Sequence, residues 1–341
     1  MNLTIPLPVQ RHVLVFDATT AIPGAGGPPA FAGNSWRGAL GHSLRALACL
    51  TGAAACTGCT RKAGCAYNYL WETPPPADAT RMRLYPQAPH PFILRELTAA
   101  GAAASGTWLM LTLVGRAYGL LPLVVQALAL AARGAHGIAG RQLRLREVLQ
   151  EHTLGALDWQ RIDGLGGVLS PRATASACCP AAPSQPVRLT LQTPLRIKKE
   201  GRAVAPHQLA FADFFGALLR RISMLCAFHT EAPLEAAFAE LMLAARAVVI
   251  RSELAWERQQ RFSNRQKQAM LMDGVTGWIE LDAADAAAFW PYLWLGQFVH
   301  AGSAATMGLG CYSIDGGVPG PARRHLVLGA SASLPDQTAA A

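Results

Sequence analysis

Strand-like and helix-like segments follow one another in a definite order along the first half of the chain. Short β-branched and apolar runs predict strands, and longer stretches with apolar residues every three or four positions predict helices. The predicted elements are a strand at 13–16, a helix at 36–50, strands at 92–94 and 107–114, a helix at 121–133 and a strand at 141–149. This is the order of the split βαβ, or ferredoxin-like, unit.

The same kinds of segment begin again after a stretch rich in Gly, Pro, Ser and Ala. The predicted elements are a strand at 187–191, helices at 206–229 and 233–249, a strand at 274–281, a helix at 285–299 and a strand at 311–314. The sequence therefore predicts an α+β protein with two tandem ferredoxin-like (RRM-like) domains, for which 341 residues suffice. The expected parts are an N-terminal domain at 1–163, a linker at 164–186, a C-terminal domain at 187–320 and a flexible tail at 321–341.

Three glycines stand between the last predicted helix and the last predicted strand. Glycine lacks a Cβ and tolerates positive φ, so such a loop can bring its backbone N–H groups close to a phosphate. A helix C-cap followed by a tight turn into the strand explains the same pattern. The candidate phosphate-binding residues of this loop are Gly302, Thr306, Gly308 and Gly310.

Four cysteines crowd a short stretch after the first predicted helix, and two of them form a C-x2-C pair. They are Cys49, Cys56, Cys59 and Cys65. Four thiolates can close a tetrahedral metal site, which leaves no open position for a substrate and is therefore structural. We expect a metal knuckle inserted in the first domain, with zinc favoured over an iron–sulfur cluster. Free, partly buried thiols are the alternative.

The chain carries a net charge of +9, which favours an acidic partner such as nucleic acid or a membrane surface. The N-terminal residues lack the basic and apolar regions of a signal peptide. The most apolar window, 109–132, is interrupted by Arg116, Pro122 and Gln126, which favours a buried strand and helix over a membrane span. We therefore expect a cytoplasmic protein without a membrane partner.

Basic residues gather in two places in the second half, close to aromatic residues. One group forms a predicted hairpin or loop, and the other follows the second helix of that half. Charges that pair with phosphates and rings that stack on bases suit single-stranded or hairpin RNA. A solvated basic face is the alternative. The candidate RNA-binding residues are Arg196, Lys198, Lys199, Arg202, Arg261 and Arg265.

Several motifs together resemble one known family. The pattern H-x-G-x3-T-x-G-L-G-x-Y at 300–312 resembles the C-terminal signature of the CRISPR-associated RAMP endoribonucleases that process precursor CRISPR RNA. L-x-T-P-L-R at 191–196 and R-F-S-x-R-Q at 261–266 are similar to further blocks of that family. W-R-G-A-L-G-H-x2-R at 36–45, the four cysteines and Y-x2-L-W-E at 67–72 are similar to a subgroup of it.

The resemblance implies two tandem ferredoxin-like domains that bind and cleave CRISPR repeat RNA. It implies a reaction without a catalytic metal, in which the RNA 2′-hydroxyl attacks the adjacent phosphate and leaves a 2′,3′-cyclic phosphate and a 5′-hydroxyl. It also implies that the product is often kept in an effector complex with other CRISPR subunits. The chain departs from the family at Ser303, where a lysine is common, and at Cys311, where a basic residue is common.

This reaction requires a base near the 2′-hydroxyl and cations around the developing phosphorane. We predict that His42 is the base and that Arg37 and Arg45 stabilise the phosphorane, with His12 and His300 as further candidates for the base. His42 packed against the sheet is the alternative, in which case the arginines act without a base.

Two other functions remain open from the sequence. The chain can instead be a non-catalytic subunit that holds the CRISPR RNA in an effector complex, and the absence of the loop lysine favours this. A third possibility is a metal-stabilised RNA-binding module outside CRISPR biology.

Overall fold

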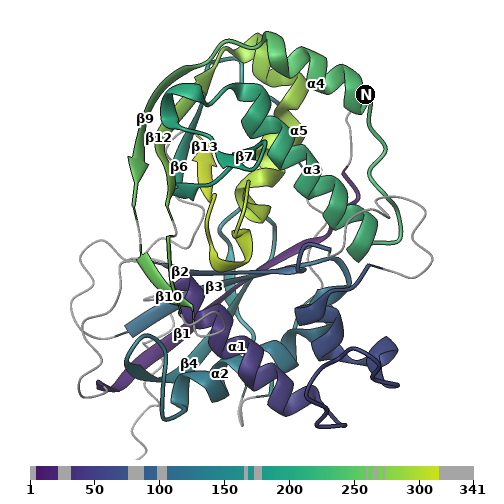
Figure 1. The fold of residues 1–341 in the computed structure, drawn as a ribbon, viewed down its shortest axis with the longest axis vertical. Coiled ribbons are helices and arrows are strands. Elements are labelled where there is room, and N and C mark those ends of the chain that lie inside the picture. Colours follow the sequence, from purple (N-terminus) through teal and green to yellow (C-terminus); the bar gives the residue numbers. More distant parts are fainter. Residues whose placement is uncertain are drawn as a thin grey trace, which may run out of the picture.

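The computed structural model shows two units stacked along the long axis of the molecule (Figure 1). It describes residues 5–21, 32–75, 88–97, 106–164, 168–172, 179–258, 260–263, 268–271 and 273–314. The first unit carries the N-terminal half of the chain and the second unit the C-terminal half. The predicted tail, 321–341, lies outside the described residues.

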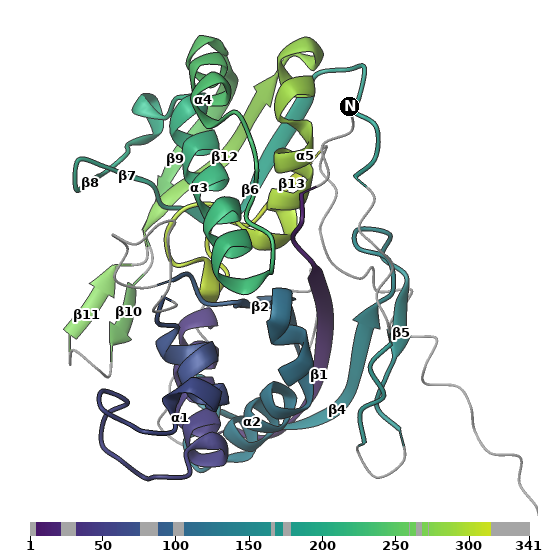
Figure 2. The ribbon, with the colours of Figure 1, turned by 90° about the vertical axis from the view of Figure 1, so that its right-hand side faces the viewer.

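The first unit has one antiparallel sheet with two main helices on one face (Figure 2). Its strands lie in the order β2-β3-β1-β4-β5. The main elements are β1 (Val9–Ala21), α1 (Gly33–Ala48), β2 (Phe92–Leu97), β3 (Gly106–Val114), α2 (Leu121–Arg133), β4 (Arg141–Glu151) and β5 (Trp159–Arg161). The short helical turns are η1 (Lys62–Gly64), η2 (Asn68–Glu72) and η3 (Gly115–Leu120).

The second unit has an antiparallel sheet in the order β13-β6-β12-β9. Its main elements are β6 (Val187–Leu195), α3 (Phe211–His229), α4 (Phe238–Ala247), β9 (Arg251–Glu257), β12 (Gly274–Leu281), α5 (Ala283–Val299) and β13 (Tyr312–Ile314). Two small hairpins are added, β7 (Lys198–Lys199) with β8 (Arg202–Ala203) and β10 (Gln260–Ser263) with β11 (Gln268–Leu271). The short turns are η5 (Pro206–Gln208) and η6 (Ala305–Met307).

Both sheets follow one plan. In each unit the first and third main strands are central, and the second and fourth flank them. The prediction of an α+β protein is confirmed, and the two antiparallel sheets are consistent with tandem ferredoxin-like units. The sequence missed β9, because its charged residues hide the strand pattern, and the structure also adds the short edge strand β5.

The apolar stretch that contains α2 is long enough to cross a membrane by composition, over Gly115–Arg133. In the structure Leu121, Val124 and Leu128 of this stretch are buried against Trp36 and Leu40 of α1. The predicted buried strand and buried helix in this window are thus confirmed.

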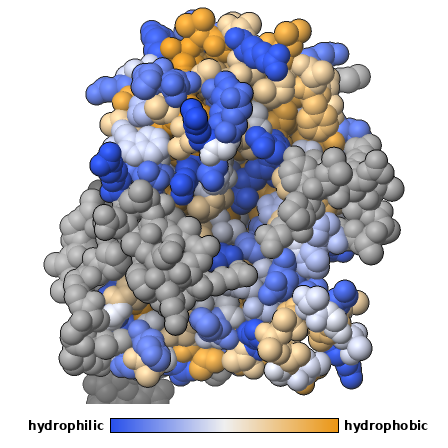
Figure 3. All heavy atoms as spheres, in the orientation of Figure 1, coloured by the Kyte–Doolittle hydropathy of each residue, from blue (hydrophilic) through white to orange (hydrophobic). Residues whose placement is uncertain are grey.

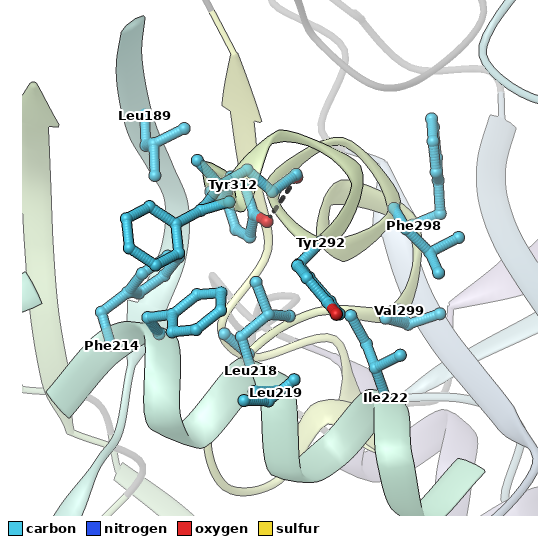
Figure 4. Packing of buried hydrophobic residues seen from close by; sticks show 14 of the residues in the cluster. Leu189, Phe214, Leu218, Leu219, Ile222, Tyr292, Phe298, Val299 and Tyr312 are labelled. Carbon is cyan, nitrogen blue, oxygen red and sulfur yellow. Dashed lines mark hydrogen bonds between the residues drawn. The ribbon is translucent and has the colours of Figure 1, made fainter. Parts of the chain in front are cut away.

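The second core is built from α3 and α5 packed on β6 and β12. Figure 4 shows Phe214 and Leu218 of α3 beside Tyr312, whose hydroxyl donates to the Leu293 carbonyl at 2.6 Å. A Cβ at Gly296 would collide with that hydroxyl oxygen, so glycine is required there. The same cluster includes residues of the first unit, and the two units therefore share a core. These residues are Leu7, Val9, Ile93, Val114 and Leu154.

Candidate functional site

The glycine-rich loop after α5 lies at the boundary between the two units (Figure 1). A Cβ at Gly308, where φ is +91°, would come within 2.9 Å of the Leu94 carbonyl in β2. Helix α1 also lies against η6 of this loop. On the other side, a Cβ at Gly302 would come within 2.6 Å of the Arg196 carbonyl at the end of β6. The loop therefore connects α1 and β2 with the start of the basic hairpin.

The backbone donors of the loop are largely used inside the protein. Gly308 N–H donates to the Ala305 carbonyl at 2.9 Å, and Gly310 N–H donates to the Pro194 carbonyl at 3.0 Å. Both glycines are buried, so the expectation that their N–H groups face a phosphate is wrong. Gly302 and Thr306 are partly exposed and stay predicted RNA contacts.

His300 and His12, the two further candidates for the base, lie inside the protein. His300 is buried at the end of α5, and its Nδ1 lies 3.1 Å from the Leu309 carbonyl, so it orders the loop. His12 is buried in β1. Burial lowers the pKa of His12 to about 3 and the pKa of His300 well below its ordinary value. Neither imidazole is placed to meet an RNA chain.

Helix α1 does not bring the three predicted catalytic residues to one point. His42 is exposed. Residues of an α-helix advance by about 100° each, so Arg37, five positions earlier, points about 140° away from it. Arg45 donates to the Ala53 carbonyl and, at 2.9 Å, to the Ala54 carbonyl, which ties α1 to the cysteine stretch.

Arg37 is held at the boundary between the units by two aromatic rings. Its Nη2 lies 3.0 Å from Nε2 of His90, and its guanidinium carbon lies 4.4 Å from the centre of the Trp71 ring. Trp71 reaches α1 only because residue 41 is glycine, since a Cβ there would overlap the indole. The structure thus assembles Arg37, Trp71 and His90, although only Arg37 was a predicted catalytic residue.

The ring of His90 is fixed in place by stacking and by a hydrogen-bond chain. Its ring centre lies 6.1 Å from that of Trp71 and 5.6 Å from that of Phe92, with nearly parallel planes. Its Nδ1 lies 2.7 Å from Thr73 Oγ1, and that hydroxyl donates to the Leu70 carbonyl at 3.3 Å. The only sequence signal for His90 was its place directly before the predicted strand at 92–94.

Helix α3 of the second unit closes this centre from the other side. His229 Nε2 lies 2.7 Å from the Pro89 carbonyl, and its Nδ1 lies 3.2 Å from the Tyr69 hydroxyl. Arg221 donates through Nε to the Val299 carbonyl at 2.6 Å. The second amino group of Arg221 (Nη2) is buried and has no hydrogen-bond partner among the described residues.

The electrostatics of this centre favour a neutral imidazole beside cations. Burial, and then the charges of Arg37, Arg221 and His229, lower the pKa of His90 to about 3. Burial lowers the pKa of His229 to about 4 and that of Arg221 to about 10. Neutral imidazoles among guanidinium groups form a site that attracts an anion such as a phosphodiester.

The four cysteines lie in one loop between α1 and η2. Cys49 Sγ and Cys59 Sγ each lie 3.8 Å from the Thr51 hydroxyl, whereas Cys56 and Cys65 pack against the first core. Hydrogen bonds from Thr51 lower the pKa of the Cys49 thiol. No three Cys, His, Asp or Glu side chains in the described part of the chain are arranged to hold a metal ion. The metal site stays a prediction.

The basic hairpin β7–β8 presents Lys198, Lys199 and Arg202 as exposed side chains. Lys199 pairs with Asp213 at 3.4 Å, and Arg196 pairs with Asp273 at 3.8 Å. On the face shown in Figure 3, hydrophilic residues predominate around the boundary between the units. Of the two remaining candidates, Arg261 lies on β10 and Arg265 lies outside the described residues.

Two models of known protein families match parts of this chain. A family model described as CRISPR-associated endoribonuclease Cas6 matches residues 189–312, the span that contains the basic hairpin and the glycine-rich loop. The second unit of the chain belongs to the Cas6 family of RNA-cleaving enzymes. A second family model, the AF_1859 N-terminal domain, matches residues 10–167, so the two models together span both units. No curated protein matches the chain.

A solved Cas6 structure shares the fold over nearly the whole chain. The Cas6 (TTHB231) product complex is 16% identical, with a TM-score of 0.54 over 90% of this chain and 100% of that one. The Cas6 (TTHA0078) product complex is 18% identical, with a TM-score of 0.49 over 91% of this chain and 99% of that one. A partial Cas6-RT-Cas1–Cas2 complex is 12% identical, with a TM-score of 0.49 over 90% of this chain and 45% of that one.

Proposed function

We propose that this Cas6-family chain cleaves precursor CRISPR RNA within its repeat, by attack of the RNA 2′-hydroxyl on the adjacent phosphate. The products are a 2′,3′-cyclic phosphate and a 5′-hydroxyl. The observation that carries the proposal is the position of Arg37, which is held by Trp71 and His90 at the boundary where the glycine-rich loop meets α1. Because the RNA supplies the nucleophile, the protein has to supply orientation, a base and positive charge.

Arg37 is the residue we assign to the scissile phosphate. A guanidinium can donate two parallel hydrogen bonds to phosphate oxygens, and its stacking on Trp71 fixes the plane of that fork. Arg45 is engaged with the carbonyls of the cysteine stretch, and we assign it to holding that loop. His42 stays the base predicted from the sequence, although it lies on a different side of α1 from Arg37.

We propose that the repeat RNA runs from the basic hairpin across the glycine-rich loop to Arg37. The loop contacts Arg196 on one side and α1 on the other, so it spans the distance between these two sets of cations. Arg261 and Arg265 are proposed as further contacts. We also propose that the chain stays bound to its RNA product in an effector complex with other CRISPR subunits.

The cysteine loop is proposed to bind a structural zinc ion through Cys49, Cys56, Cys59 and Cys65. Its support is the ligand set of four thiols on one short segment, together with the hydrogen bonds by which Arg45 ties that segment to α1. When bound, zinc would cross-link this loop and stabilise it. No step of the RNA cleavage passes through this ion.

A non-catalytic RNA-holding subunit is the second candidate function. The loop carries Ser303 where a lysine is common in the family, and its N–H donates to the Arg196 carbonyl at 2.8 Å. The loop therefore contributes little charge to a transition state, which suits binding better than cleavage.

One experiment distinguishes the cleaving enzyme from the RNA-holding subunit. The purified chain is incubated with its cognate repeat RNA in excess EDTA, and the product end groups are resolved. Cleavage to a 2′,3′-cyclic phosphate, reduced at least about 100-fold in Arg37→Ala, is the expected result. Tight RNA binding without cleavage by the wild type would contradict the enzyme and leave the RNA-holding subunit.

A further inference from the structure

We propose that His90 is the general base that takes the proton from the attacking 2′-hydroxyl. The inference rests on the proposed function and replaces His42 in that role. Three observations carry it: the fixed tautomer of His90, the direction of the lone pair on its Nε2, and the position of that lone pair beside the arginine assigned to the phosphate.

The hydrogen bonds of His90 determine which nitrogen can accept a proton. Arg37 has only donors, so the 3.0 Å contact makes His90 Nε2 the acceptor. The proton of the neutral ring then lies on Nδ1, which donates to Thr73 Oγ1 at 2.7 Å. The Thr73 hydroxyl donates its own proton to the Leu70 carbonyl at 3.3 Å. A base oriented by a second group in this way is the arrangement that nucleophile activation requires.

The lone pair on Nε2 points to the guanidinium that we assign to the scissile phosphate. A phosphate offers Arg37 charged acceptors, which bind a guanidinium more strongly than a neutral imidazole does. Phosphate binding therefore draws Arg37 away from Nε2 and leaves the lone pair free. The attacking 2′-hydroxyl and the scissile phosphate are attached to the same ribose, at its 2′ and 3′ positions. Binding of the phosphate to Arg37 therefore places this hydroxyl beside Nε2 of His90.

The charges around His90 change in the direction that the reaction needs. Among the described residues, the charged and titratable groups facing it are Arg37 from α1 and Arg221 and His229 from α3, and Trp71, Thr73 and Phe92 also contact the ring. In the free protein, burial and these cations lower the pKa of His90 to about 3. An RNA phosphate adds a negative charge beside the ring, which raises the pKa and strengthens the base.

Bonds and protons balance in the proposed step. His90 Nε2 takes the proton of the 2′-hydroxyl, and the 2′ oxygen forms a bond to phosphorus. The bond from phosphorus to the 5′ oxygen breaks, and the leaving oxygen takes a proton from solvent water. The imidazolium then loses its proton to solvent.

The test compares single-turnover cleavage rates of the wild type, His90→Ala and His90→Gln, with His136→Ala as the matched control. His136 is exposed in the turn after α2, far from Arg37 in the chain. RNA affinity is measured separately with a repeat that carries a 2′-deoxy nucleotide at the cleavage position. This RNA lacks the attacking hydroxyl, so its binding is measured without cleavage.

We expect His90→Ala to lose about 100-fold or more in rate, with the affinity for the 2′-deoxy repeat within a few-fold of the wild type. Its rate should rise about tenfold per pH unit between about pH 6 and 8, because hydroxide replaces the base, whereas the wild-type rate stays nearly flat. Added imidazole should restore part of the lost rate in His90→Ala. His90→Gln keeps an acceptor for Arg37 but cannot act as this base, so it should fold normally and remain slow.

Cleavage by His90→Ala within about threefold of the wild type, with the same pH profile, would overturn the inference alone. An equal loss of rate and of affinity would also overturn it, because His90 would then serve binding. Absence of cleavage by the wild type would instead refute the proposed function, and the base assignment with it.

Discussion

Gly41 illustrates how one missing side chain shapes the site at the scale of the residue. It lets the Trp71 indole lie against α1, and the indole in turn supports the guanidinium of Arg37. A methyl group added at Gly38, one turn earlier on the same helix, would meet no heavy atom within 4 Å, so the two glycines form a natural pair for comparison.

The pair gives opposite expectations. Gly38→Ala should raise the free energy of unfolding by about 1 kcal/mol, because alanine is the better helix former. Gly41→Ala should lower it by about 1–3 kcal/mol, because Trp71 is stacked on His90 and Phe92 and cannot move aside freely. Urea unfolding measures both, and RNA cleavage should fall only in Gly41→Ala. Equal stability and activity of the two variants would contradict the role of the Trp71 contact.

At the scale of the element, the cysteine loop acts as a support for the site. Arg45 closes the loop onto α1, and its guanidinium carbon lies 5.7 Å from the Tyr67 ring centre. The Tyr67 ring stacks on the Trp71 ring with their centres 6.4 Å apart. The cysteine loop therefore supports Arg37 indirectly, through contacts of Arg45 with Tyr67, of Tyr67 with Trp71 and of Trp71 with Arg37.

The proposed zinc ion is tested on this element. The purified protein should contain about one zinc ion per chain, and Cys59→Ser should lose it and lower the Tm. Metal analysis and thermal unfolding provide the measurements. Cys179→Ser, a half-buried cysteine outside the loop, serves as the control and should keep the zinc. Equal zinc contents in Cys59→Ser and the control would refute the site.

At the scale of the whole molecule, His12, His229 and His300 are buried and His90 is partly buried, in a chain whose net charge is already positive. Burial is the first cause of a lowered pKa in each, to about 3 for His12 and His90, to about 4 for His229 and well below the ordinary value for His300. His90, His229 and His300 lie at or near the boundary between the units. Protonation would therefore add positive charge at this boundary and weaken the contact between the units at the site.

The stability should therefore fall as the pH falls through the unfolded-state pKa of histidine. Below about pH 6.5 the unfolded chain takes up protons that the folded chain refuses until about pH 4, so acid favours unfolding; above about pH 7 the effect is absent. We expect the Tm to drop by about 5 °C or more between about pH 7 and pH 5, measured by calorimetry. A constant Tm over this range would show that these histidines are not held neutral. His136→Ala should leave the slope unchanged.

Most elements and their order could be predicted from the sequence, because hydrophobic periodicity and glycine punctuation are local. The basic hairpin, the glycine-rich loop and Arg37 were identified for the same reason. Which groups meet depends on the tertiary fold: Arg37, Trp71 and His90 come from three separate segments, and Arg221 and His229 come from the other unit. The fold also explains why Gly308 and Gly310 serve packing, because a glycine pattern does not reveal what lies opposite the missing Cβ. Local patterns specify conformation, whereas stacking and burial between distant segments specify the site.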